Sequence, residues 1–467
     1  MSAKTPKHTN SYDLSWLNEY RHITVIGLGM SGIGVVAKLA EHGIDVYVQD
    51  SRKQPPGESN LRKMTNVINC QFGGFDQQLL LESDLLIISP GVSLQTPEIQ
   101  QAMAQGIEVT GDVDIVARST HLPLIAITGS NGKSTVTELV GELAKAHHLE
   151  VFVGGNIGRS CMELLDDSAK YELAVLEVSS YQLETTKAMQ AHSSVVLNVS
   201  PDHLDRYDGF EDYASTKLSV YTESKNIVWN RQDKWLQNVS LLFASKQQAA
   251  NDQIISFGLD VPRNNNEYGL LKEGEDIYFA RGTTKICHVS ASQLIGAHNH
   301  LNVLAALALL SEYDLNNAII EKTLKTFVGL KHRMQKVREL DGVVWINDSK
   351  ATNIGATESA LMGLGGRNIL LAGGQGKGAD FSELTPVLEQ YVKHVFLFGE
   401  DSQQMYSLWK DQVSCSLVDS LEYAVSEAYE LATSGDAVLL APACASFDMF
   451  ASFEQRGERF MQLVEAL

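Results

Sequence analysis

The sequence has no long hydrophobic run and no cluster of basic residues. Its 467 residues include 37 Lys and Arg against 57 Asp and Glu, which gives a formal charge of −20 at pH 7. A charge this negative repels nucleic-acid phosphates and anionic lipid headgroups. The longest apolar stretches, near residues 85 and 438, are much shorter than the roughly 20 residues that cross a bilayer. We therefore predict neither a nucleic-acid partner nor a membrane partner.

Cysteine and proline are also scarce. The five cysteines are widely spaced, odd in number and without a CxxC pair, which favours reduced thiols over a disulfide framework. The N-terminal segment lacks the apolar core of a secretory signal. Ten prolines stand against 36 glycines, and no low-complexity tract interrupts the chain. We expect a cytoplasmic protein that is folded along its length.

Short runs of Val, Ile and Leu alternate with helix-length amphipathic stretches over most of the chain. This alternation is typical of α/β domains with mainly parallel sheets. Three such blocks predict a Rossmann-like domain over 1–111, a phosphate-loop ATPase-like domain over 112–328 and a Rossmann-like α/β domain over 329–467. Residues 226–290 look strand-poor and are expected to form the exposed margin of the middle domain. The expected strands are 23–26, 45–48, 85–89, 124–127, 174–177, 195–199, 343–346, 368–372, 394–398 and 436–440.

A first glycine-rich turn, GLGMSG, occupies residues 27–32, directly after an expected strand. Asp50 ends the next strand, so the segment matches the fingerprint GxGxxG followed by an acidic residue about 20 positions later. Such glycines let the backbone approach a pyrophosphate at a helix N-terminus. Three interpretations stay open here: a bound nucleotide diphosphate, NAD, or a purely structural turn. Ser51 and Arg52 could hydrogen-bond a ribose, base or phosphate, or belong to a solvated loop.

A second glycine-rich turn, TGSNGKST, lies between an expected strand and an amphipathic helix. Its amides would surround phosphate oxygens, and Lys133 would neutralise the β- and γ-phosphates. The pattern GxxxxGK[ST] is not met, because Ile127 stands where its first glycine would be. The turn still predicts ATP binding, with Mg²⁺ reached by a hydroxyl of the last two residues. The residues concerned are Gly129, Ser130, Asn131, Gly132, Lys133, Ser134 and Thr135.

Further motifs follow this loop in order. They are GGNIG, LEVSSYQLE, NVSPDHLDRY, STKLSVY, GAHNHLN, LKHR, INDSKATN, GGQGKGADF and PACASFDMFASFEQRG. With TGSNGKST, this series resembles the Mur ligases of peptidoglycan synthesis, and NDSKATN, GGQGKGADF and ACASFD resemble their D-glutamate-adding branch. The resemblance implies an ATP-dependent ligase that joins D-glutamate to UDP-N-acetylmuramoyl-L-alanine through an acyl phosphate. We expect it to act as a monomer.

Three residues of these motifs are candidates for metal binding and catalysis together with Lys133. Glu177 ends an expected strand and could hold Mg²⁺ with a loop hydroxyl, or could cap the turn that follows. His203, beside Asp202, suits a second cation, a proton transfer or a structural role. Lys217 alone would be interpreted as a surface lysine of a helix. The resemblance instead implies that Lys217 is carbamylated and helps His203 to hold a second Mg²⁺.

The remaining site residues are implied by the resemblance. Nucleotide contacts are expected from Asn299, Asn302, Arg333 and Asp348. UDP-substrate contacts are expected from Met30, Ser31, Asp50, Ser51, Arg52 and Asn156. D-glutamate contacts are expected from Lys350, Thr352, Lys377, Ser446, Phe447 and Phe453. Two lysines and two hydroxyls suit a ligand with two carboxylates, whereas the two phenylalanines could equally be core residues. Gln375 stands where relatives often carry Asp, so no charge-based role is expected there.

Other functions are weighed against this one. Another Mur-type ligase is less favoured, because the DNPR motif of the diamino-acid adders is absent. An NAD-dependent oxidoreductase would leave the phosphate loop unexplained. A nucleotide-switch binding protein would hydrolyse ATP without any dependence on an amino acid. Because ATP and glutamate contacts are expected on different domains, the C-terminal domain should close over the middle one.

Overall fold

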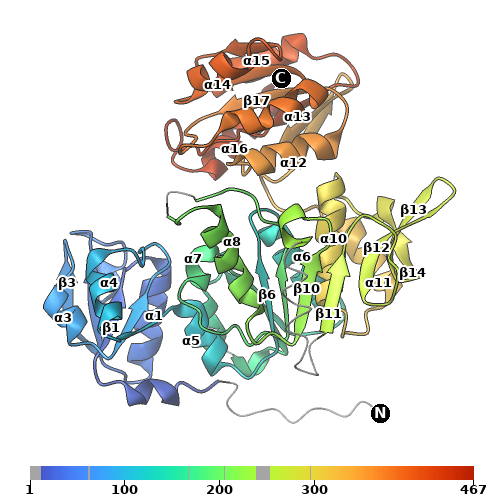
Figure 1. The fold of residues 1–467 in the computed structure, drawn as a ribbon. Coiled ribbons are helices and arrows are strands. Elements are labelled where there is room, and N and C mark those ends of the chain that lie inside the picture. Colours follow the sequence, from blue (N-terminus) through green and yellow to red (C-terminus); the bar gives the residue numbers. More distant parts are fainter. Residues whose placement is uncertain (1–11, 62–63, 167, 204–205, 238–252, 295) are drawn as a thin grey trace.

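The computed structural model describes residues 12–61, 64–166, 168–203, 206–237, 253–294 and 296–467. The described chain forms three α/β blocks, each built around its own sheet (Figure 1). Every expected strand overlaps an observed strand. Among the described residues, no helix is long and apolar enough to span a membrane.

The N-terminal block is a five-stranded parallel sheet of order β3-β2-β1-β4-β5. Its strands are β1 (Ile23–Ile26), β2 (Val46–Asp50), β3 (Val67–Phe72), β4 (Leu85–Ile88) and β5 (Glu108–Thr110). Its helices are η1 (Ser15–Glu19), α1 (Met30–Glu41), α2 (Glu58–Leu61), α3 (Gln77–Leu81) and α4 (Pro97–Ala104). Every residue of β1 and β4 is buried, which explains their continuous apolar runs. The first glycine-rich turn joins the central strand β1 to α1.

The middle block has a nine-stranded sheet of order β14-β13-β12-β11-β10-β9-β6-β8-β7, parallel from β7 to β12. Its strands are β6 (Leu124–Thr128), β7 (Val151–Gly155), β8 (Leu173–Glu177), β9 (Ser193–Val196), β10 (Asn226–Asn230), β11 (Gln253–Phe257), β12 (Glu267–Glu273), β13 (Asp276–Arg281) and β14 (Thr284–His288). Its α-helices are α5 (Asp112–Ser119), α6 (Lys133–Ala146), α7 (Ser180–Leu183), α8 (Phe210–Leu218), α10 (Ala297–Leu309) and α11 (Asn317–Thr326). Short 3₁₀ turns are η2 (Cys161–Leu165), η3 (Ser168–Lys170), η4 (Ser219–Tyr221) and η5 (Val289–Ala291).

The expectation that residues 226–290 are strand-poor is wrong, because the described part of this stretch holds β10 to β14. The antiparallel strands β12 to β14 are each buried over only part of their length and carry several charges. A half-exposed strand gives a weaker apolar signal than a strand buried on both faces. Their expected place at the margin is confirmed, since β14 is an edge strand.

The C-terminal block has a six-stranded sheet of order β15-β16-β20-β17-β18-β19, in which only β15 is antiparallel to its described neighbour. Its strands are β15 (Gln335–Leu340), β16 (Val343–Asn347), β17 (Asn368–Gly373), β18 (Val392–Phe398), β19 (Cys415–Leu417) and β20 (Ala437–Leu440). Its helices are α12 (Ile354–Leu364), η6 (Phe381–Leu384), α13 (Thr385–Tyr391), α14 (Ser402–Trp409), α15 (Leu421–Leu431) and α16 (Phe453–Ala466).

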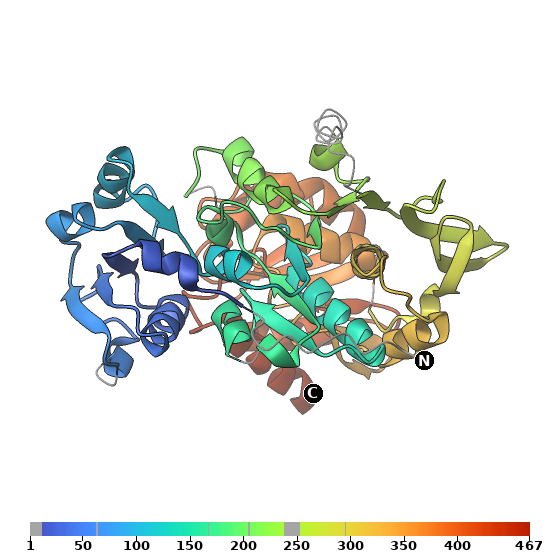
Figure 2. The ribbon, with the colours of Figure 1, turned by 90° about the horizontal axis from the view of Figure 1, so that it is seen from below.

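The three blocks meet at the middle one (Figures 1 and 2). The C-terminal block lies over one end of the middle block, where α12 contacts α10. The N-terminal block lies beside the middle block, where α1 contacts α5 and η2. Polar loops from all three blocks are therefore brought towards the ends of β1, β6 and β16, where ligands bind in open α/β sheets.

Candidate active site

The second glycine-rich turn follows β6 and ends where α6 begins at Lys133. Gly129 has a φ of +146° and Gly132 a φ of +85°, a region that disfavours other residues. A Cβ on Gly132 would lie 2.6 Å from the Asn302 Oδ1 atom. The loop is closed by Asn131, whose amide donates to Asn198 Oδ1 at 2.8 Å. The unpaired amides at the start of α6 provide an anion-binding end for this turn.

Two lysine side chains converge on one carbonyl of this loop. Lys133 Nζ donates to Gly129 O at 2.7 Å, and Lys217 Nζ donates to the same oxygen at 3.0 Å. Burial lowers the pKa of both amines, and the charge of Lys133 lowers the pKa of Lys217 further. The interpretation of Lys217 as a surface residue is wrong, since it is 2% exposed and lies over the Tyr213 ring.

Glu177, at the end of β8, is 2% exposed. Its Oε1 atom accepts a hydrogen bond from Asn156 Nδ2 at 2.9 Å, whereas its Oε2 atom is buried without a hydrogen-bond partner. The turn after β8 is capped instead by Ser179 and Gln182, so the capping role considered for Glu177 is wrong. A buried carboxylate oxygen with no donor is the kind of group that a divalent cation satisfies.

His203 follows β9 and has a φ of +55°. Its Nδ1 atom pairs with the Tyr181 hydroxyl at 2.8 Å, and its Nε2 atom lies 3.7 Å from Asp202 Oδ2. Burial lowers the pKa of His203, Asp202 raises it, and the two loop lysines lower it again. A neutral imidazole can offer a nitrogen lone pair to a metal. The next two residues of this motif lie outside the described residues.

An arginine of the C-terminal block reaches the loop directly. Arg333 Nη2 donates to Ser134 Oγ at 2.7 Å, and burial lowers the pKa of Arg333. Asp348 accepts from the Met334 amide at 3.2 Å. Burial raises the pKa of Asp348 to about 7, although the Arg333 charge opposes this shift. The structure thus joins Ser134 to the C-terminal block, and the neighbouring Thr135 is also buried at the start of α6.

Asn299 and Asn302 stand in the first turns of α10. Asn302 Nδ2 donates to Asn299 Oδ1 at 2.9 Å, and both side chains are buried beside Gly132. Ser130 is fixed separately, because its hydroxyl donates to Ser200 O at 3.0 Å. The predicted ATP residues therefore form one cluster around the loop.

Two D-glutamate candidates of the C-terminal block lie near this cluster, since, besides burial, the charge of Lys133 lowers the pKa of Lys350 and the charge of Lys377 lowers that of His203. Lys350 Nζ lies 4.0 Å from the centre of the Phe453 ring, and Lys377 Nζ lies 5.7 Å from that of Phe447. Burial lowers the pKa of Lys350 to about 8, and the positive charge of Arg333 contributes. Phe447 is 66% exposed, so the interpretation of this ring as a core residue is wrong.

One buried arginine holds the loops that carry these candidates. Arg456 donates to Ser349 O at 2.9 Å and to Cys444 O at 3.1 Å, next to Lys350 and Ser446. The Gln375 amide also donates to Ala445 O at 3.0 Å, so the role of Gln375 seen here is in its backbone. Thr352 lies on the loop between β16 and α12.

Sequence reasoning missed Arg456. A signal for it was present, because Arg456 shares the spacing i, i+4, i+8 with the buried residues Phe460 and Val464 of α16. An arginine on an apolar stripe needs buried acceptors, and it finds them at the ends of the neighbouring strands.

The UDP-substrate candidates divide into two places. Asp50 accepts from the Leu28 amide at 2.7 Å and from Arg52 Nη2 at 2.6 Å. Burial raises the pKa of Asp50, but these hydrogen bonds outweigh burial and lower it overall. Asn156 is not at this turn, since it lies beside Glu177.

The other three candidates lie around the first glycine-rich turn. Met30 is 83% exposed at the start of α1, and Ser51 is exposed after β2. Ser31 hydrogen-bonds the buried carboxyl group of Asp112, which begins α5. Ser31 thus lies at the seam between the N-terminal and middle blocks.

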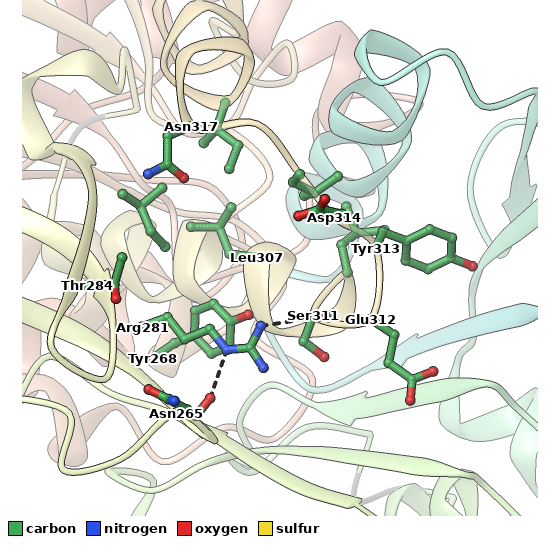
Figure 3. Close-up of a pocket in the computed structure, with 14 residues that line it drawn as sticks. Asn265, Tyr268, Arg281, Thr284, Leu307, Ser311, Glu312, Tyr313, Asp314 and Asn317 are labelled. Atoms are coloured by element: carbon green, nitrogen blue, oxygen red, sulfur yellow. Dashed lines mark hydrogen bonds between the residues drawn. The ribbon is translucent and has the colours of Figure 1, made fainter. Parts of the chain in front are cut away.

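A separate pocket of about 560 Å³ lies at the margin of the middle block, between β12 to β14 and the end of α10 (Figure 3). Arg281 spans one side of it, donating to Asn265 O at 2.8 Å and to Ser311 O at 3.2 Å. Glu312 also lines this pocket, and its carboxylate pairs with Lys225 at 2.8 Å. None of the site residues described above lines this pocket.

No group of three His, Cys, Asp or Glu side chains within the described ranges could hold a metal unaided. Mg²⁺ commonly binds one or two carboxylates together with substrate phosphates. The unpartnered oxygen of Glu177, close to the phosphate loop, fits such a shared site.

Comparison with known proteins places all three blocks in one family. Residues 21–111 match the model "Mur ligase MurD-like, N-terminal domain", residues 127–310 the "Mur ligase middle domain" and residues 332–444 the "Mur ligase, glutamate ligase domain". The chain is 43% identical over 451 residues to a protein of Acinetobacter baylyi named "UDP-N-acetylmuramoylalanine--D-glutamate ligase", covering 95% of this chain and 98% of the relative. A protein of Shewanella oneidensis with the same name is 43% identical over 456 residues, covering 96% and 99%.

Solved structures share the fold at lower identity. A pseudomurein peptide ligase type C from Methanothermus fervidus superposes with a TM-score of 0.58 at 18% identity, covering 96% of this chain and 99% of the other. A UDP-N-acetylmuramate-alanine ligase from Thermotoga maritima gives 0.56 at 18% identity, covering 95% and 99%. With the phosphate loop, the unpaired Glu177 oxygen and three matched domains, this chain belongs to the Mur ligase family.

Proposed function

We propose that this enzyme uses ATP to join D-glutamate to UDP-N-acetylmuramoyl-L-alanine, releasing ADP and phosphate. The observation that carries this proposal is the contact between Arg333 and Ser134, which joins the phosphate loop to the C-terminal block that also carries Lys350 and Lys377. The names of relatives that are 43% identical over nearly the whole chain support the same substrates. The enzyme would act as a cytoplasmic monomer in peptidoglycan precursor synthesis.

Each domain takes one ligand in this proposal. Residues 1–111 would bind the UDP-substrate, 112–328 ATP, and 329–467 D-glutamate together with part of the nucleotide. An NAD enzyme is less well supported, because it would leave the phosphate loop and the lysines of the C-terminal block without a role.

In the first step, the carboxylate of the L-alanyl end attacks the γ-phosphate of ATP in line. Lys133 would exchange its contacts with Gly129 O and Ser130 O for phosphate oxygens and so stabilise the charge of the transition state. Mg²⁺, when bound, screens repulsion between the two anions. Glu177 and a hydroxyl of Ser134 or Thr135 would hold one such ion.

In the second step, the neutral amine of D-glutamate attacks the acyl phosphate carbon. A tetrahedral intermediate then forms and collapses to the amide, with loss of phosphate. Lys350 and Lys377 would hold the glutamate carboxylates, and Thr352 and Ser446 would donate hydrogen bonds. Phe447 and Phe453 would shape the pocket around them.

Lys217 is proposed to carry a carbamate. A buried amine whose pKa is lowered well below its usual value is available as the neutral nucleophile that adds to CO₂, releasing one proton. The product is an anionic ligand that, with His203, would hold a second Mg²⁺. Carbon-13 NMR after exposure to labelled bicarbonate should show a carbamate signal. This signal should be absent from Lys217→Ala and present in Lys145→Ala, which changes an exposed lysine.

The activity is tested by phosphate release from MgATP with UDP-N-acetylmuramoyl-L-alanine and D-glutamate, L-glutamate or no amino acid. Release that requires both the UDP-substrate and D-glutamate is the expected result. Release with a different amino acid would indicate another Mur-type ligase. Release that ignores both substrates would indicate a nucleotide switch and would contradict the proposal.

A further inference from the structure

Arg206 forms a bridge between the N-terminal and middle blocks. It lies between β9 and α8, and its side chain is 11% exposed. Its Nη1 atom donates to Pro90 O at 2.8 Å, and its Nη2 atom donates to Val92 O at 3.1 Å. Both acceptors are backbone carbonyls of the loop that follows β4 in the N-terminal block. A side chain of the middle block thus holds backbone that is more than a hundred residues away in sequence.

The loop that Arg206 holds supports the first glycine-rich turn. The Ser89 hydroxyl donates to Gly27 O at 2.6 Å, and a Cβ on Gly27 would lie 2.8 Å from Val92 Cγ2. A shift of Pro90 and Val92 would therefore move the turn proposed to bind the UDP-substrate. No sequence pattern had indicated this coupling.

The same guanidinium also contacts Glu184 and Tyr181 of the middle block, and Tyr181 in turn contacts His203. Its Nε and Nη2 atoms donate to the two oxygens of Glu184 at 3.0 and 2.6 Å. The guanidinium also stacks over the Tyr181 ring at 3.9 Å, and the Tyr181 hydroxyl pairs with His203 Nδ1 at 2.8 Å. One planar group therefore contacts both the UDP-side loop and the residues that orient His203.

We propose that Arg206 is a positioning residue that fixes the UDP-substrate loop relative to the histidine at the reacting phosphate. This inference rests on the proposed function. The donors of a guanidinium form a rigid fork, and here they meet acceptors from two blocks, whereas a lysine offers one rotatable ammonium. Paired with Glu184, the charge can remain largely buried. A misplacement of about 1 Å between reacting groups can cost roughly 100-fold in rate.

The test is Arg206→Lys, with Arg231→Lys as the matched control. Arg231 is another buried arginine of the middle block, donating to Asp260 Oδ1 at 2.8 Å and to Tyr268 O at 2.8 Å, and it contacts none of the site residues named above. Arg206→Lys should raise KM for the UDP-substrate about 10-fold and lower kcat, with KM for ATP nearly unchanged. Arg231→Lys should leave KM for the UDP-substrate, KM for ATP and kcat unchanged, even where both variants lose the same thermal stability.

A second pair of variants separates the two edges of the bridge. Tyr181→Phe keeps the ring under Arg206 but removes the hydroxyl at His203, so it should change the Mg²⁺ dependence and leave KM for the UDP-substrate unchanged. In Arg206→Ala, added guanidinium ion should restore part of the lost affinity. Calorimetric titration with the UDP-substrate, without ATP, measures the affinity for this substrate independently of turnover. It therefore tests the contacts of Arg206 with Pro90 and Val92.

These experiments distinguish failure of the positioning role of Arg206 from failure of the proposed ligase activity. A wild-type enzyme that fails to release phosphate with both substrates would contradict the proposed function. An active wild type with Arg206→Lys unchanged in UDP-substrate affinity would overturn the positioning role alone. Equal changes in the KM values for ATP and UDP-substrate would also overturn it, because they would indicate a general loss of structure.

Discussion

Glu177 illustrates how a single atom defines a site. Its buried Oε2 atom has no donor, although leaving a buried carboxylate oxygen unpaired normally costs about 1–3 kcal/mol or more. Such a cost is tolerated at functional positions, where a bound ion replaces the missing partner. The oxygen therefore indicates a cation site more strongly than its place at a strand end does.

Glu177→Gln is expected to lower kcat by roughly 100-fold and to raise the Mg²⁺ concentration needed for half-maximal rate. Thermal stability should hold or rise, because the amide keeps an acceptor for Asn156 and removes a buried negative charge. Phosphate release over a Mg²⁺ titration measures the effect. Glu142→Gln, an exposed change on α6, is the control. Equal Mg²⁺ dependence in both variants would argue against a metal at Glu177.

Lys350 predicts a pH dependence. Burial, with help from Arg333, lowers its pKa to about 8, so its positive charge is present below pH 8 and is lost above it. KM for D-glutamate should therefore rise as the pH increases through about 8. Lys350→Arg should flatten this rise, because a guanidinium stays charged. A wild-type KM that is constant from pH 7 to about pH 9.5 would contradict a binding role for the ammonium.

The first turn of α12 serves both the C-terminal block and its neighbour. Asn353 caps this helix by accepting from the Ala356 amide at 2.8 Å, while its Nδ2 atom donates to Asp202 Oδ2 at 3.1 Å. One amide thus ends the loop that carries Lys350 and Thr352 and also contacts the residue next to His203. A helix cap is in this way also a contact between domains.

Asn353→Ala and Asn316→Ala compare a shared cap with an ordinary one. Asn316 caps α11 by accepting from the Ala318 amide at 2.9 Å, away from the interface. Each variant should lose about 1 kcal/mol in free energy of unfolding. Only Asn353→Ala should also raise KM for D-glutamate, as measured by phosphate release. Equal kinetics in the two variants would limit Asn353 to capping.

If the three blocks bind separate ligands as proposed above, they should move relative to one another during the reaction. The contacts of the C-terminal block with the middle block include polar side-chain pairs, notably Arg333 with Ser134 and Asn353 with Asp202. Interfaces of this kind allow domains to open and close around ligands. The seam at Arg206 is more extensively bonded and should move less.

Small-angle X-ray scattering should detect this closure. We expect the radius of gyration to fall when the UDP-substrate and a non-hydrolysable ATP analogue with Mg²⁺ are added together. ATP analogue alone should have a smaller effect. Identical profiles with and without ligands would contradict closure.

Much of the fold could be predicted because parallel strands buried on both faces, such as β1 and β4, leave continuous apolar runs. The phosphate loop and Glu177 could be predicted because both lie at strand ends with local sequence signals. The strands β12 to β14 at the margin of the middle sheet could not, since they are only partly buried and their apolar residues are interrupted by charges.

The parts of the site that escaped prediction depend on pairs distant in sequence. Two such contacts, Arg206 with Pro90 and Arg456 with Ser349, join segments about a hundred residues apart. No local sequence pattern around either residue of a pair indicates its partner. The burial of Lys217 has the same origin, because only the folded chain brings its amine to Gly129 O.

The contact of Lys133 and Lys217 with the same acceptor, Gly129 O, has a consequence for how newly folded enzyme becomes active. Burial and the nearby charge of Lys133 lower the pKa of the Lys217 amine well below its usual value, so folding brings this amine closer to its uncharged, nucleophilic form. If Lys217 carries a carbamate as proposed, a newly folded chain must first react with dissolved carbon dioxide at this amine before it is active. Cell-wall growth would in this way depend on the supply of a gas.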